Sequence, residues 1–435
     1  MHFQTKKSTS LLTAAILLAS ANQASAVPID NIPGANATTN SLGGYIDTYI
    51  DEYNRFTGDG GSISNAEGNL LSLCNDYATA AAEASSSSEV KNVISLLEYV
   101  SHEEVGAMGS GFTDTGHDQM NSVMGRMQYL RSGAPALASN MLWQSGGAAG
   151  DDFSRLSLYS NFSYGDGSKD RTRNEQGFDF DSQAFTVGGD YRLSDALIAG
   201  VAFGFGQSDV SVDNSAGDTS GDTYSLTGYT SMYVDSWYVD ASLGYATHSY
   251  DSSRYIPSSL ILGFTEQTLK SDTDGDSLSW SLGAGYAYDM YGWTADYALR
   301  LDSVSASIDG YRETGGTLAL DVGKQDIDSL QGVLSAQFSK AYSTEMGVIL
   351  PSLGLEIHQE FDDETRVVTA QYALDRFNNQ FSFSSDDADK SFYLLSAGGS
   401  WVMTQGNQMF LNLDHLVGLD DVSSNTITAG FRMEL

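Results

Sequence analysis

The sequence predicts a mainly β protein, a 12-stranded antiparallel outer-membrane β-barrel preceded by an N-terminal helical segment. The chain holds 45 Gly, 24 Tyr and 19 Phe but only 5 Pro, which suits long antiparallel strands. From Phe153 to Leu435 apolar residues alternate with small or polar ones, the pattern of strands with two different faces. Short and long connections also alternate there, as in a barrel with tight turns at one rim and longer loops at the other.

Residues 1–26 have the pattern of an export signal. Lys6 and Lys7 precede an apolar stretch from Leu11 to Ala21, and the small residues Ala24 to Ala26 match a cleavage site. We therefore expect the mature chain to begin at Val27, which is not a lipid-accepting Cys. No later run of about 18 apolar residues predicts a transmembrane helix. A soluble exported protein and an outer-membrane barrel both remain open at this point.

The region before the barrel divides in two. Residues 27–64 are predicted to be short and weakly ordered, because Asp30 to Gly61 is rich in Asn, Thr, Gly and Asp. Residues 65–150 form a helical lead-in and linker, with helices expected over Asn65 to Ala84 and Glu89 to Tyr99. The run Ser85 to Ser88 separates these two helices.

A further helix is expected over His117 to Arg131. Apolar residues recur there at spacings of three and four, which places them on one helical face. They are Met120, Val123, Met124, Met127 and Leu130. Arg126 and Arg131 lie elsewhere on this helix.

Residues 151–435 are predicted to be the barrel. In Leu197 to Gly206 the large apolar residues alternate with small ones, and Trp237 to Ala246 alternates in the same way. A soluble sandwich shows the same alternation, so connection lengths have to decide. Short turns fall at Ser194 to Asp195, Asp235 to Ser236, Asp289 to Gly292, Ala341 to Thr344 and Thr404 to Asn407. Long polar connections fall at Gly165 to Gly177, Gln207 to Gly221, Tyr250 to Gly275, Ser305 to Asp321 and Phe361 to Asp389.

This regular alternation favours the membrane barrel, and counting strands between the connections gives an even number, twelve. Backbone groups left unpaired in hydrocarbon are costly, so a spanning sheet has to close. Aromatic residues gather at the short-turn rim and predict an interfacial girdle. They are Tyr191, Trp237, Tyr288, Tyr291, Trp293 and Tyr342.

The charge of the chain argues against nucleic acid as a partner. Its 56 acidic and 21 basic residues give a formal net charge of −35, which repels phosphate backbones and anionic headgroups in the absence of divalent cations. We interpret this surface as a means of solubility in a salty habitat. The single Cys74 cannot form an intramolecular disulfide.

The string Gly275-Asp276-Ser277-Leu278 matches the first motif of GDSL esterases and makes Ser277 a candidate nucleophile. Such enzymes need a base and an oxyanion hole. The string lies in mid-barrel at the mouth of a strand, no Asp-x-x-His follows it, and His358 and His415 fall in barrel strands. We therefore interpret Ser277 as a strand residue.

The same stretch places Asp272, Asp274 and Asp276 at alternate positions, a spacing found in calcium loops. An EF-hand requires Gly at position six and Glu at position twelve, where this chain has Ser277 and Gly283. A solvated acidic loop is the preferred interpretation. Neither metal-ligand spacing among the His residues nor a phosphate-binding Gly loop is found, so no catalytic, cofactor-binding or metal-binding residues are predicted.

Several separate blocks carry a family resemblance. They are Asp190 to Leu193 with Ala199 to Gly206, then Leu353 to Asp363, Ser396 to Ser400, Phe410 to Asp421 and Thr428 to Arg432. In this order they resemble the β-domain of autotransporters, the translocator of type V secretion. Upstream blocks resemble the family's lead-in: Asn69 to Asn75, His102 to Ala107 and Arg126 to Gly133.

This resemblance implies a helix inside the barrel, for which His117 to Arg131 is the candidate, with a surface helix on the rim as the alternative. Arg126 or Arg131 would then meet lumen acids such as Asp240. The family usually ends in an aromatic residue, whereas this chain has Leu435. The resemblance also makes residues 27–64 a very short passenger.

The expected function is a non-enzymatic outer-membrane translocator that anchors, and in some form exports, this passenger. A surface adhesin acting through acidic outer loops is the alternative, and a GDSL-type esterase is the third candidate. The expected partners are outer-membrane lipid and lipopolysaccharide, with the Sec translocon and the barrel-assembly machinery during biogenesis. The barrel itself is expected to be monomeric, in the outer membrane of a Gram-negative bacterium, with loops on the cell surface.

Overall fold

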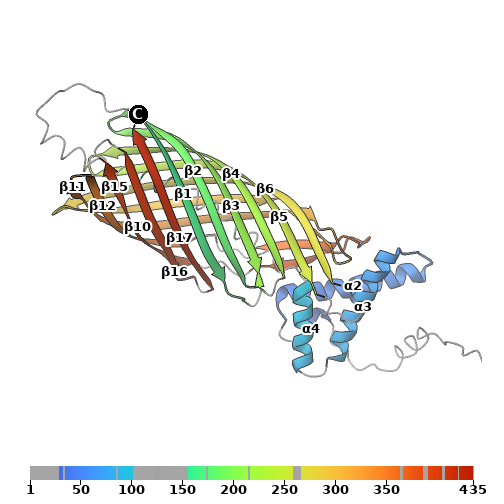
Figure 1. Ribbon diagram of the computed structural model, residues 1–435. Helices are drawn as coiled ribbons and strands as arrows, with labels where there is room; N and C mark the ends of the chain where they lie inside the picture. Colours follow the sequence, from blue (N-terminus) through green and yellow to red (C-terminus); the bar gives the residue numbers. More distant parts are fainter. Residues whose placement is uncertain are drawn as a thin grey trace, which may run out of the picture.

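The computed structural model describes residues 29–32, 35–84, 87–100, 123, 125, 127, 155–172, 175–213, 216–257, 266–362, 366–385, 390–403, 407–419 and 421–434. It shows a long barrel with a small second sheet and a group of helices beyond one rim (Figure 1). The predicted export signal lies outside these residues, as does most of the helix expected over His117 to Arg131.

The large sheet has thirteen strands in the order β10-β7-β6-β5-β4-β3-β2-β1-β17-β16-β15-β12-β11. Pairing of β10 with β12 closes it, and β11 is only a short piece of the hairpin between them. Twelve strands therefore surround the lumen, all paired antiparallel, which confirms the predicted barrel. Their bounds are β1 Leu156–Lys169, β2 Phe178–Ser194, β3 Leu197–Val212, β4 Gly217–Val234, β5 Trp237–Ile256, β6 Gln267–Met290, β7 Trp293–Ile308, β10 Gln325–Lys340, β11 Tyr342–Thr344, β12 Gly347–Glu360, β15 Ser391–Met403, β16 Gln408–Val417 and β17 Val422–Glu434.

The first and last barrel strands seal the cylinder. β1 pairs with β17 in an unbroken register from Ser157 opposite Glu434 to Lys169 opposite Val422. Every backbone ladder in the wall is thereby satisfied by a neighbouring strand, as a hydrocarbon environment demands.

The two faces of the wall differ as the alternation predicts. On β4, Leu226 is 62 % exposed on the outside, whereas the next residue, Thr227, is 3 % exposed and points inward. The six predicted girdle aromatics all lie exposed near the short-turn rim. That rim has a tight hairpin at Tyr291 and Gly292, with φ of 54° and 79°. Positive φ at both central residues gives the turn a twist that matches the strands.

Much of the sequence that was predicted to form long connections forms strands in the structure. β3 and β4 stay paired as far as Val212 opposite Gly217, and β5 and β6 as far as Ile256 opposite Gln267. These polar stretches were expected to be loops because they lack an apolar face. They form strands that extend the wall beyond its apolar band. Some of their residues, such as Ile256 and Leu269, are fully buried there in a hydrophobic core.

Two of the long connections carry a second sheet. It has four short strands in the order β14-β13-β9-β8. The connection between β7 and β10 supplies β8 Tyr311–Arg312 and β9 Leu320–Val322, and that between β12 and β15 supplies β13 Val367–Tyr372 and β14 Phe381–Ser384.

The N-terminal segment is helical, with η1 Ile29–Asn31, α2 Ala37–Gly58, α3 Asn65–Glu83 and α4 Ser87–Val100. α3 and α4 confirm the two helices expected there. No helix in the described part of the chain has the length and apolar character needed to cross a membrane.

α2 corrects the expectation that Asp30 to Gly61 is weakly ordered. Asn36 caps the helix by accepting a 2.7 Å hydrogen bond from the Thr39 amide. Leu42, Tyr45, Ile46, Tyr49 and Tyr53 then form a buried stripe. The polar composition concealed this stripe, whose apolar partners lie in distant parts of the sequence.

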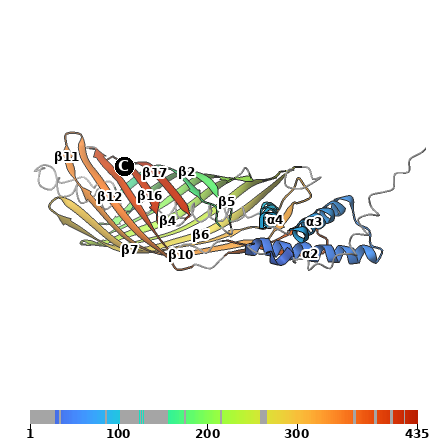
Figure 2. The ribbon, with the colours of Figure 1, turned by 90° about the horizontal axis from the view of Figure 1, so that it is seen from below.

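Figure 2 shows the helices grouped at one end of the barrel, while the C-terminal strand ends at the other. The end that carries the helices is the rim of the long connections. The helices, the small sheet and the outer ends of β5 and β6 share one hydrophobic core, with Leu42, Leu70, Ile256 and Phe381 among its buried members. A second, smaller cluster lies in the lumen.

Candidate functional site: the barrel lumen

The lumen is lined by acidic side chains held in hydrogen bonds. Asp190 on β2 accepts from the hydroxyls of Ser157 at 2.9 Å and Tyr229 at 3.3 Å. Asp240 on β5 accepts from Ser231 at 2.5 Å. The donors lie on β1, which is next to β2, and on β4, which is next to β5 and separated from β2 by β3. The carboxylates are 3 % and 5 % exposed, so the hydroxyls compensate for part of their lost hydration.

Glycine makes room for large lumen side chains. A Cβ at Gly200 would overlap the ring of Tyr229 on the next strand, and Gly188 stands in the same relation to Tyr159. The two tyrosines meet edge to face, with ring centroids 6.4 Å apart. Glycines on β2 and β3 therefore accommodate aromatic rings from the neighbouring strands β1 and β4.

Residues from the predicted lumen helix pack on these rings. The backbone at Val123, Gly125 and Met127 is helical, and the side chains of Val123 and Met127 are 0 % exposed. They form one buried cluster with Tyr159, Ala202, Tyr229 and Val304. This part of the expected helix therefore lies inside the barrel, and the rim-packing alternative does not hold for it. Arg126 and Arg131 lie outside the described residues, so their pairing with Asp240 stays a prediction.

A second polar network crosses the lumen wall from β7 to β12. Arg300 donates to Asp302 at 2.6 Å and to Glu356 at 3.3 Å. His358 contacts the same Glu356 at 3.2 Å and Gln331 at 3.1 Å. His358 is thus engaged in a structural network of the wall.

The structure places Ser277 inside β6 and not at the mouth of a strand. Its hydroxyl lies 3.0 Å from Nε2 of His248 on β5, and Nδ1 of His248 lies 2.9 Å from the hydroxyl of Thr223 on β4. All three side chains are buried. Sequence reasoning missed this contact, because only the strand register brings His248 close to Ser277.

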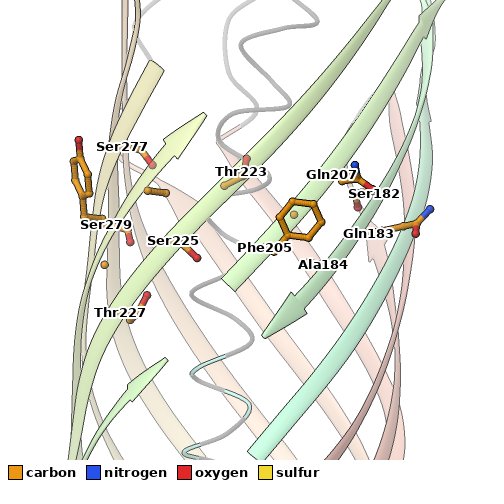
Figure 3. Close-up of a pocket in the computed structure, with 14 residues that line it drawn as sticks. Ser182, Gln183, Ala184, Phe205, Gln207, Thr223, Ser225, Thr227, Ser277 and Ser279 are labelled. Carbon is orange, nitrogen blue, oxygen red and sulfur yellow. The ribbon is translucent and has the colours of Figure 1, made fainter. Parts of the chain in front are cut away.

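Ser277 also borders a small hollow in the inner wall (Figure 3). Hydroxyls from β4 and β6, on either side of β5, gather there, among them Thr223, Ser225, Thr227 and Ser279. Such a surface offers both donors and acceptors of hydrogen bonds, mixed with apolar residues such as Ala184, Phe205 and Ala246, and carries no charged side chain. Its chemistry is that of a neutral wall.

The candidate calcium triplet does not form a loop. Asp272, Asp274 and Asp276 lie in β6 and are all exposed on its outer face. A cation site needs ligands that converge from several directions, whereas these three side chains are spread along one strand. Among the described residues no group of three or more metal-ligating side chains is found.

A closed twelve-stranded cylinder with an apolar outer band, an aromatic girdle and a polar lumen defines an outer-membrane β-barrel. Residues 158–414 match the Autotransporter beta-domain, more than half of the 435 residues. The chain belongs to this family, and its barrel is the outer-membrane translocator domain of a Gram-negative bacterium.

A solved relative shares the fold. The translocator domain of the autotransporter NalP from Neisseria meningitidis is 13 % identical, with a TM-score of 0.52, over 74 % of this chain and 99 % of that domain. At this identity the likeness concerns the fold alone.

Two curated relatives match part of the sequence. The esterase EstA of Pseudomonas aeruginosa is 26 % identical over 277 residues, which is 60 % of this chain and 36 % of the relative. An uncharacterised protein from the trpE-trpG intergenic region of Pseudomonas putida is 30 % identical over 191 residues, 42 % of this chain and 31 % of the relative. The chain spans about a third of the length of these relatives.

Proposed function

We propose that this barrel exports its own N-terminal helices through the lumen to the cell surface. One observation carries the proposal. Helices α2 to α4 lie at the rim of the long connections, whereas β1 starts at Leu156 opposite Tyr191, near the short-turn rim. Between them in the sequence, Val123 and Met127 lie in the lumen. The placement of the helices at one rim, of Val123 and Met127 in the lumen and of the start of β1 at the other rim supports export through the lumen.

The lumen supports this path. Its buried carboxylates on β2, β5 and β7 suit a helix that carries cations, and we propose that Arg126 and Arg131 face them. Small residues on β3 leave space beside the tyrosines. We also propose its partners: lipid and lipopolysaccharide, which the exposed apolar band of the wall supports, and the Sec translocon and barrel-assembly machinery during biogenesis. Closure leaves no free strand edge in the barrel, which favours a monomer.

An epitope tag after Val27, on intact cells, tests the export. We expect antibody and added protease to reach the tag, because the helices lie on the long-connection side. A second tag inserted between Tyr291 and Gly292, in a short turn, should become accessible only after the outer membrane is opened. The folded barrel is recognised by heat-modifiable migration, a gel band that shifts when the sample is heated. An N-terminal tag that stays protected on intact cells while the barrel shows this heat-modifiable band would overturn the proposal.

We further propose that the barrel has no catalytic role and that Ser277 has a structural role in the barrel wall. His248 lies between two hydroxyls, one on each side of β5, so the three side chains link neighbouring strands. Purified protein should hydrolyse p-nitrophenyl butyrate no faster than a control barrel. Wild-type hydrolysis that disappears in Ser277→Ala, with the heat-modifiable band intact, would contradict this. Adhesion through the acidic loops stays a prediction.

A further inference from the structure

We infer that the exported helices stay docked, without need of a covalent link, on a platform that the barrel builds from its own outer connections. The inference rests on the proposed export, since it assigns a place to the helices once they are outside. The platform consists of the four-stranded sheet β14-β13-β9-β8 with the outer ends of β5 and β6. Its ligand is the chain's own segment α2 to α4.

Apolar contacts between helices and platform are extensive. Tyr45 on α2 packs on Tyr372 of β13 and Phe381 of β14, with ring centroids 5.3 Å apart in both pairs. Tyr53 meets Phe377 edge to face at 5.0 Å. Tyr372 and Phe381 are each 1 % exposed. Buried aromatic anchors of this kind dominate the affinity of protein interfaces.

The helix also covers the open edge of the platform. β14 is an edge strand of the small sheet, and its amides at Ser382 and Ser384 donate to the hydroxyls of Ser41 and Thr38 on α2, at 2.8 Å and 3.1 Å. Unpaired amides at a sheet edge invite pairing with other chains. The side chains of α2 satisfy them and so make the helix part of the sheet's own hydrogen bonding.

Polar contacts join both α2 and α3 to the connection between β13 and β14. Arg376, from the connection between β13 and β14, donates to Glu67 of α3 at 2.7 Å, and its guanidinium lies 4.7 Å from the ring centre of Phe56. In the same connection, the Asn379 amide donates to Glu52 at 2.8 Å. Polar and charged groups of the platform thus face complementary groups on the helices.

The platform is fixed to the barrel. Arg254, near the outer end of β5, forms a two-pronged ion pair with Glu313, between β8 and β9, at 3.0 Å and 2.6 Å. Both side chains are almost fully buried, at 3 % and 2 % exposure. Strands of two to six residues do not form a stable sheet alone and need a covering layer. The helices therefore provide the covering layer that the small sheet needs.

Cutting the chain between α4 and the lumen tests the docking. A protease site inserted between Gly109 and Ser110, with an epitope tag after Val27, allows the link to be severed in folded protein. We expect the tagged fragment to remain with the barrel, on intact cells and during detergent purification, and to separate only on denaturation.

Two variants sharpen the test. Tyr45→Ala should increase release of the cut fragment by roughly thirtyfold, the effect expected for a buried aromatic anchor. Arg376→Ala should also increase release, whereas Arg312→Ala should not, because Arg312 pairs with Asp321 on the exposed side of the same small sheet. Release from wild type as fast as from Tyr45→Ala would overturn the inference, as would equal release from both arginine variants.

The two proposals fail separately. If export is wrong, the tag stays inaccessible on intact cells, yet cut and detergent-purified protein still reports whether the fragment is retained. If docking alone is wrong, the tag is accessible on cells and the fragment leaves after cutting. The heat-modifiable band of the barrel shows in each case that the variant has folded.

Discussion

The phenol of Tyr45 donates a 3.0 Å hydrogen bond to Oδ2 of Asp375, a residue 330 positions later in the chain. Tyr45 belongs to α2 and Asp375 to the connection that follows β13. This buried contact joins the first part of the chain to an outer loop near its end. It requires both to be on the same side of the membrane before the interface forms.

Replacing this carboxylate should loosen the helices and leave the barrel intact. Asp375 also accepts from the amides of Phe377 and Asn379, at 2.8 Å and 3.1 Å, so Asp375→Ala leaves one buried and two partly buried donors without this acceptor. Each unsatisfied group costs roughly 1–3 kcal/mol. We expect the free energy of unfolding of the helical part to fall by about 3 kcal/mol, measured by urea and helical circular dichroism. Tyr45→Phe, which removes one donor only, should cost about 1 kcal/mol.

Cys74 provides a built-in probe of the same opening. It is the single cysteine of the chain, 2 % exposed on α3, and burial raises the pKa of its thiol well above the usual range. Because the thiolate is the reactive species, folded protein should react very slowly with a maleimide. Asp375→Ala should speed labelling at least about tenfold, in line with a loss of more than 1.4 kcal/mol. Equal labelling rates in the two proteins would show that this contact does not hold the helices closed.

Stability of the helical part should fall in acid. Burial acts to raise the pKa of Glu67, but hydrogen bonds from Ser64 and the guanidinium of Arg376 outweigh it and lower the pKa to about 2. Ionised Glu67 therefore stabilises the fold above its ordinary pKa of 4.5, and this contribution, roughly 2–3 kcal/mol, disappears as the pH falls from about 4.5 to about 2. Glu67→Gln should be less stable at pH 7 and lose the difference from wild type near pH 2. A difference in stability between the two proteins that is the same at pH 7 and at pH 2 would contradict this prediction.

A larger side chain at Gly200 should disturb the lumen wall. A Cβ there overlaps the ring of Tyr229, so Gly200→Val should displace that ring from Asp190 and destabilise the barrel by about 1–3 kcal/mol. The measurement is the urea dependence of the heat-modifiable band. Gly228 on β4 is the matched control, since nothing lies within 4 Å of a Cβ placed there, and Gly228→Ala should leave the midpoint within error. Equal midpoints for the two variants would refute this account of the glycine.

The barrel was predictable from sequence because its two environments impose a period of two on every strand. The outward Leu226 and inward Thr227 show this directly. The helix α2 was not predictable, because its buried stripe from Leu42 to Tyr53 packs against residues far away in the sequence, such as Phe381 of β14. Similarly, the contact between His248 and Ser277 depends on the register of β5 and β6, in which His248 faces Gly275. Nothing in the local sequence around either residue fixes that register.

Leu299 and Arg300 test the proposition that the outer face meets lipid. They are neighbours on β7, yet Leu299 is 64 % exposed on the outside, whereas Arg300 points inward to Asp302 and Glu356. An arginine on the lipid face near the midplane costs about 2–4 kcal/mol. Leu299→Arg should therefore lower the yield of folded barrel in lipid vesicles by a large factor, while Leu299→Met behaves as wild type. The same Leu299→Arg chain should lose less in detergent, whose headgroups solvate the guanidinium more easily. If the arginine variant folds into vesicles as well as the methionine variant, the exposed leucines of this wall do not face hydrocarbon. The assignment of this barrel to a membrane would then be wrong.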